Sequence, residues 1–210
     1  MAYTNTHSGP ISGINAVLQT VGAGAVSGMV AGFLWGGVGG RIAMRILFLA
    51  SGDRVRGLTS DDGFEIGTFS GATIILLIGT TLLGTVGGTA FGLLRRFLRG
   101  QRWVVVSMVA LTAAVVGGGA FVEFEGIDFR LLKPLWLAIG LFVFLPGAWG
   151  ATVAILTDHL IEKGNRTFNL QPLGSREPVR LAASVVAWAV LGTVFTLGAV
   201  ELLSDIAQLT

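Results

Sequence analysis

The stretch from Gly24 to Gly40 reads GAVSGMVAGFLWGGVGG and carries glycine at every fourth position: Gly24, Gly28, Gly32, Gly36 and Gly40. Nearly all of its other residues are apolar. In water a glycine inside a helix costs about 1 kcal/mol relative to alanine, so five of them need a compensating interaction. Small residues supply one between helices in lipid, because they let two backbones approach closely. The stretch therefore predicts a membrane helix with a glycine contact face.

The composition of the whole chain also indicates a membrane protein. Its 210 residues have a mean hydropathy of +0.77 and are 12% charged, whereas soluble domains have about 25% charged residues. Apolar runs long enough to cross a hydrocarbon core of about 30 Å cover approximately residues 16–38 with an extension to 50, 67–94, 103–122, 135–157 and 180–203. We expect an all-α fold: one polytopic integral membrane helix bundle, a single domain over residues 1–210, with five transmembrane helices and Gly-mediated close packing.

The second span repeats the glycine spacing with Gly84, Gly88 and Gly92. Four residues turn an α-helix by about 400°, so such a row drifts by about 40° per step and meets one partner over two or three repeats only. Consecutive spans are antiparallel neighbours, so we predict that the first two spans pack on each other. This packing either serves the fold alone or lines a homo-oligomeric pore.

The basic residues predict the orientation. The loops after the second and fourth spans contain eight basic residues against three acidic ones, and such loops face the cytoplasm. The basic ones are Arg95, Arg96, Arg99, Arg102, Lys163, Arg166, Arg176 and Arg180. The opposite side has more acidic than basic residues. We therefore expect a multi-pass protein of the cell membrane with a cytoplasmic N-terminus and an external C-terminus.

Charged residues beside the first span form a second candidate feature. Arg41 and Arg45 lie one helical turn apart in apolar sequence, on the predicted outer side. Arginines at membrane depth are either paired or extend to the headgroups. The candidate partners on the same side are Glu123, Glu125 and Glu201, which together with the arginines would form an outer-side polar cluster. The segment beyond Gly40 either breaks away near GGVGG or projects beyond the membrane.

Two further motifs have structural and functional interpretations. Pro146 and Gly147 lie inside the fourth span, and a proline there predicts a helix kink; such kinks either shape packing or help coordinate an ion. The segment TSDDGFEIG contains three carboxylates within five residues. A helix N-cap with Asp62 and Glu65 as its box is the favoured interpretation, and a cation site is the alternative.

The sequence offers little for catalysis. It has no cysteine, and its two histidines, His7 and His159, are far apart, which argues against a thiolate or histidine metal site. We find no nucleophile, dyad or metal set at a shared depth, so we expect no enzyme activity, cofactor or metal, and no nucleic-acid partner. The expected partners are the lipid bilayer and other membrane chains or copies of itself. We favour a non-catalytic structural or accessory subunit of a membrane assembly; the alternative is a channel or transporter for a small solute or ion.

Overall fold

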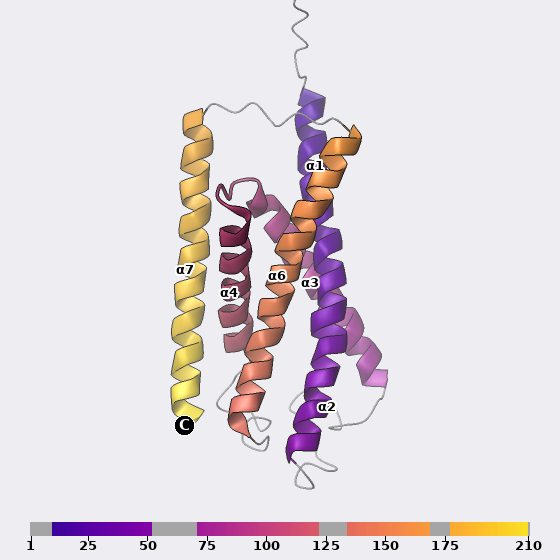
Figure 1. Ribbon diagram of the computed structural model, residues 1–210, viewed down its shortest axis with the longest axis vertical. Helices are drawn as coiled ribbons and strands as arrows, with labels where there is room; N and C mark the ends of the chain where they lie inside the picture. Colours follow the sequence, from indigo (N-terminus) through magenta and orange to yellow (C-terminus); the bar gives the residue numbers. More distant parts are fainter. Residues whose placement is uncertain (1–9, 52–70, 122–133, 169–176, 210) are drawn as a thin grey trace, which may run out of the picture.

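A computed structural model describes residues 10–51, 71–121, 134–168 and 177–209, and they are almost entirely helical (Figure 1). The elements, in chain order, are α1 (Pro10–Ala31), the π-helix η1 (Gly32–Gly39), α2 (Gly40–Ser51), α3 (Gly71–Arg95), α4 (Arg102–Phe121), α6 (Leu135–Phe168) and α7 (Glu177–Leu209).

The described residues confirm the expectation of an all-helical chain with five helices long and apolar enough to span a membrane. These candidate spans are Ile14–Ser51, Thr73–Arg95, Arg102–Ala120, Leu135–Asn165 and Leu181–Gln208. They indicate a multi-pass membrane protein. Three helices are longer than their predicted spans: the first begins at Pro10, α6 continues to Phe168 and α7 continues to Leu209. Hydropathy marks only the part of a helix that suits lipid, and backbone hydrogen bonding continues into the polar sequence beyond it.

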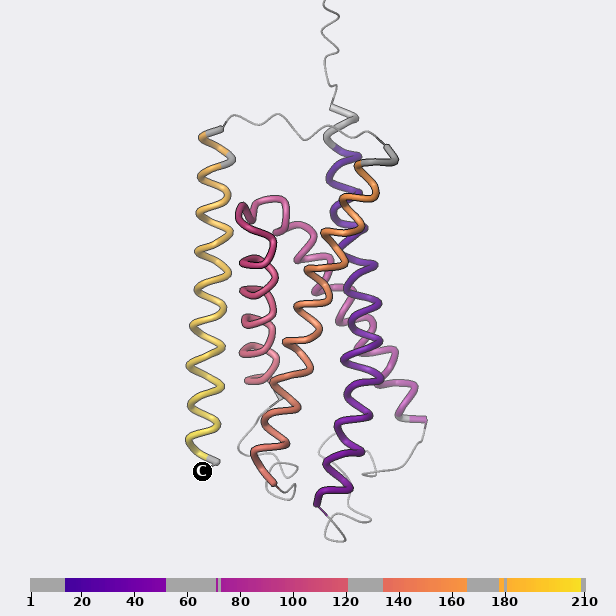
Figure 2. The backbone as a smooth tube through the Cα atoms, viewed as in Figure 1, coloured from indigo at the N-terminus to yellow at the C-terminus, as the bar shows by residue number. Residues whose placement is uncertain are grey.

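The first helix does not break at GGVGG, so the first of the two alternatives for the segment beyond Gly40 is wrong. α1, η1 and α2 follow one another without interruption and form one long rod (Figure 2). At 1.5 Å per residue, the rod from Pro10 to Ser51 is roughly 60 Å long, about twice the thickness of a hydrocarbon core. Its glycine-rich middle widens into π-helical turns instead of ending the helix.

The helices form a layered arrangement in which each rod contacts few others. α1 packs most extensively against α3 and also along α6, while α4 packs against both α6 and α7. The α1–η1–α2 rod and α7 lie on opposite sides of α6 and α4 (Figure 2). The start of α1 and the end of α7 lie at opposite ends of the bundle (Figure 1).

The outer faces of the bundle are strongly apolar. Large aliphatic side chains on α3 and α7 remain exposed, among them Ile74, Ile75, Leu82, Leu83, Val86, Val185, Val186, Val190, Leu197, Val200 and Leu203. Soluble monomers rarely expose continuous apolar patches larger than a few hundred Å². Lipid or another membrane chain is the environment that suits these faces.

Candidate functional site

The glycines of the first two long helices lie against one another. We call Gly24, Gly28 and Gly32 of α1 with Gly84, Gly88 and Gly92 of α3 the glycine seam. A Cβ added to Gly28 would overlap the carbonyl oxygen of Gly84 and lie 2.8 Å from the Cα of Gly88. In the opposite direction, a Cβ on Gly88 would lie 2.6 Å from the Cα of Gly28. The backbones are so close here that no side chain fits between them.

The predicted glycine row leaves the seam after Gly32. A Cβ on Gly36, in η1, would lie 2.8 Å from the Cβ of Thr80, so this glycine faces a side chain of α3. A Cβ on Gly40 would meet nothing within 4 Å. From Gly32 to Gly39 the helix is π-helical, so residues four apart no longer follow the α-helical spacing that aligned the first three glycines.

The π-helix η1 lies beside the proline-containing part of α6. Its Trp35 donates a hydrogen bond from Nε1 to Oγ1 of Thr152 over 2.9 Å. The rings of Trp35 and Phe144 are T-shaped, with their centroids 5.9 Å apart. A Cβ on Gly39 would lie 2.9 Å from Cδ2 of Leu145. π-Helical turns are rare and occur frequently at functional sites. The π-helix therefore contacts α6 on both sides of Pro146.

Pro146 and Gly147 lie inside α6, which continues through them. They face α4: a Cβ on Gly117 would lie 2.5 Å from the Cβ of Pro146, and one on Gly147 would lie 3.2 Å from the Cβ of Ala114. The ring of Pro146 is thus accommodated by a glycine of the neighbouring helix. The predicted kink stays a prediction.

An ion pair joins α3 to α6 at the end of the bundle where α1 begins. Arg95 donates from Nε to Oδ1 of Asp158 over 2.6 Å and from Nη2 to Oδ2 over 3.1 Å. Its Nη1 donates to the carbonyl of Leu98 over 2.9 Å. The side chains of Arg95 and Asp158 are 20% and 9% exposed, and Nε of Arg102 lies 3.9 Å from Oδ2 of Asp158. Bidentate arginine–carboxylate pairs fix geometry as well as charge.

The sequence interpretation missed this pair, because it counted Arg95 and Asp158 only as loop charges. One signal was available: both residues directly follow apolar spans and lie at the same predicted end. The two residues are 63 positions apart in sequence, and only the register of α3 against α6 shows that they meet.

The α3–α4 turn, residues Arg95 to Arg102, is held by further contacts. The ring of Trp188 in α7 donates from Nε1 to the carbonyl of Arg99 over 3.0 Å. Leu98 is buried in the main apolar core, and its N–H donates to the carbonyl of Leu94 over 3.3 Å. The turn is therefore tied to α3, α6 and α7.

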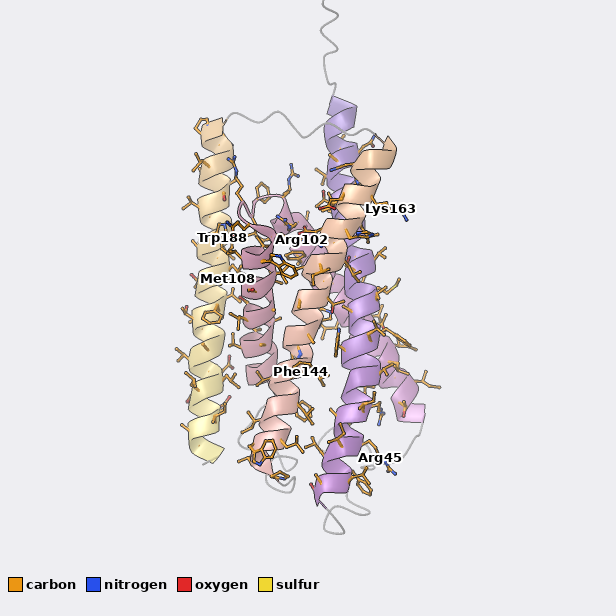
Figure 3. The ribbon with its side chains drawn as sticks, viewed as in Figure 1. Arg45, Arg102, Met108, Phe144, Lys163 and Trp188 are labelled. Carbon is orange, nitrogen blue, oxygen red and sulfur yellow. The ribbon has the colours of Figure 1, made fainter. Side chains whose placement is uncertain are left out.

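The proposed outer-side polar cluster combines residues of α2, of α7 and of the sequence after α4. Glu123 and Glu125 lie outside the described residues, as does the segment TSDDGFEIG. Arg41 is half-buried on α2, and Arg45 is exposed with its guanidinium 5.3 Å from the centroid of Phe48. Arg45 lies on the opposite side of α6 from α7, the helix that carries Glu201 (Figure 3). The outer-side polar cluster stays a prediction.

In the part of the chain that the structure describes, no group of three or more histidine, cysteine or acidic residues could hold a metal ion. Comparisons with protein-family models, with curated proteins and with solved structures find no match to this chain. The site can therefore be interpreted only from its own residues.

Proposed function

We propose that this chain is a non-catalytic structural or accessory subunit of a membrane assembly. The observation that carries the proposal is the pair of apolar faces on α3 and α7, which internal packing leaves exposed along most of each helix. α7 packs extensively on α4 alone among the described helices. A partner chain on one of these faces and lipid on the other would cover the apolar surface.

In this proposal, the glycine seam holds α1 and α3 together. Lipid tails are as apolar as leucine, so apolar burial does little to drive helices together in a membrane. Close backbone contact between α1 and α3 supplies dispersion contacts instead, and it holds the rods in a fixed register. The seam then builds a rigid body that presents the faces of α3 and α7 to neighbours.

The subunit proposal is tested by bulky substitutions on each outer face. Leu197 of α7 and Leu83 of α3 are highly exposed, so tryptophan at either site leaves internal packing intact. The full chain is extracted from its native membrane in mild detergent, and the mass of the particle is measured. We expect a stoichiometric second chain with the parent protein, and its loss in one of the two variants, Leu197→Trp or Leu83→Trp. A parent protein that runs alone, or two variants that both retain the second chain, would contradict the proposal.

A channel or transporter is the second candidate, favoured by one observation. The π-helix η1 and the Pro146 segment of α6 are in contact, and irregular helices at membrane depth form ion sites in transporters. Purified protein that forms a symmetric homo-oligomer and conducts ions in liposomes would favour this candidate over the subunit.

We also propose that the N-terminus is cytoplasmic and the C-terminus external. The α3–α4 turn, at the same end of the bundle as the start of α1, has the arginines that the positive-inside rule assigns to the cytoplasm. A phosphatase reporter that is active only outside the cytoplasm, fused after Thr210, is expected to be active. Activity of a cytoplasm-specific reporter at the same position would reverse the orientation.

A further inference from the structure

The two ends of the bundle differ in charge. Over residues 95–102 and 158–163, at the end that carries the α3–α4 turn, there are five cationic side chains, Arg95, Arg96, Arg99, Arg102 and Lys163, against the carboxylates of Asp158 and Glu162. The opposite end has Arg41 and Arg45 against Glu201 and Asp205. Figure 3 shows Arg102 and Lys163 toward one end and Arg45 toward the other. Only the first end has an excess of positive charge over these residues.

The cations of the turn differ in exposure. Arg95 uses its donors on Asp158 and on the carbonyl of Leu98, so it positions the turn. Arg96 and Arg99 are exposed, and Arg102 has a side chain that is 43% exposed. The turn is fixed at both sides, by the ion pair and by the Trp188 hydrogen bond to Arg99. Exposed guanidinium groups are therefore presented on an ordered backbone.

Aromatic and apolar side chains beside these arginines place them near lipid. Trp103 is 70% exposed at the start of α4, and Phe97 and Val104 are also exposed. Exposed tryptophans gather at the membrane–water interface, at the depth of the headgroups. The guanidinium of Arg96 lies 5.1 Å from the centroid of the Phe97 ring. Positive charge and apolar surface thus meet at one place.

We propose that the α3–α4 turn binds the headgroup phosphate of an anionic phospholipid. Arg96 and Arg99 contact the phosphate, whose oxygens suit the planar guanidinium fork. Trp103 and Val104 contact the glycerol and the first part of the acyl chains. This apolar neighbourhood is the reason to choose a lipid over a free phosphate ion. Basic sites between or beside membrane helices bind such headgroups. The proposal is independent of the subunit role.

The test measures lipid binding to the full-length protein in neutral detergent by native mass spectrometry. Phosphatidylglycerol and phosphatidylcholine are titrated separately, and the double variant Arg96→Gln/Arg99→Gln is compared with the parent. A basic residue near an anionic surface contributes about fivefold in affinity. We expect the parent to prefer phosphatidylglycerol, and the double variant to lose about twenty- to thirtyfold in that preference. The preference should also fall as salt rises.

The matched control is Arg45→Gln, compared with the single variant Arg96→Gln. Arg45 is also an exposed arginine over a neighbouring phenylalanine, but at the other end of the bundle. Arg96→Gln should reduce the preference about fivefold, and Arg45→Gln should leave it unchanged. Equal losses in the two single variants, no preference in the parent, or full competition by inorganic phosphate would overturn the proposal. An unchanged melting temperature shows that the variants are folded.

Discussion

Replacing Gly28 with leucine is expected to reduce the yield of folded, monodisperse protein more than tenfold. A Cβ at this position already overlaps the carbonyl of Gly84 and approaches the Cα of Gly88. Both obstacles are backbone atoms, so α1 and α3 must separate for the side chain to fit. Adding methylenes to a packed core typically costs about 1–3 kcal/mol through side-chain and backbone shifts, and here the leucine would have to displace a whole helix. Size-exclusion chromatography of a fluorescent fusion measures the yield.

The control for this substitution lies on the same helix. Gly22 is exposed, and a Cβ there would meet nothing within 4 Å. Gly22→Leu makes the same change in helix propensity and hydropathy without a clash, so it should accumulate like the parent. Gly88→Leu and Gly79→Leu provide the same comparison on α3, since Gly79 also has open space. Equal yields from Gly28→Leu and Gly22→Leu would show that the seam contributes nothing to folding.

Breaking the Arg95–Asp158 pair should be the second large effect. Asp158→Asn removes the carboxylate and leaves the guanidinium of Arg95 mostly buried beside a neutral amide. Loss of one partner of a buried pair costs about 3–5 kcal/mol, because the remaining charge has no compensation. The partial exposure of Arg95, at 20%, places the expected loss toward 3 kcal/mol. The melting temperature in detergent should fall clearly below that of the parent.

Two variants show whether the loss of stability comes from the Arg95–Asp158 ion pair or from any change of charge on α6. Glu162→Gln removes an exposed carboxylate one turn further along α6, and its melting temperature should match that of the parent. The double variant Arg95→Met/Asp158→Leu removes both charges and should recover most of the loss, because apolar residues of similar volume replace buried pairs well. A double variant that is less stable than Asp158→Asn would contradict this explanation.

Sequence patterns were sufficient to predict the long helices. Lipid-spanning runs of apolar residues are the strongest signal in a membrane protein. Each of the five predicted runs overlaps one of the five long apolar helices. The fourth and fifth helices extend further than their predicted ends, to Phe168 and Leu209. Those ends are polar, and hydropathy cannot distinguish a polar helix from a loop.

The contacts between helices could be predicted only in outline. The four-residue glycine spacing in the first two spans indicated a contact face, but it does not determine which glycine faces which. The structure places Gly28 between Gly84 and Gly88, a result of antiparallel register. The π-helix was missed, because GGVGG is equally compatible with a break and with a widened turn. Arg95 and Asp158 looked like separate loop charges because the sequence does not determine the register of α3 against α6.

The most direct test of the central claim, close packing of the first two long helices on each other, is a disulfide cross-link beside the glycine seam. The chain has no native cysteine, so the two introduced cysteines are the only thiols that maleimide can label. A Cβ on Gly36 would lie 2.8 Å from the Cβ of Thr80, closer than the about 3.5–4.5 Å between the Cβ atoms of a disulfide. The two backbones must therefore separate by about 1 Å for the bond to form. After mild oxidation in native membranes and unfolding in dodecyl sulfate, which exposes any free thiol, Gly36→Cys/Thr80→Cys should not react with maleimide, while Gly22→Cys/Thr80→Cys should react fully. Equal reactivity of the two pairs would contradict the account.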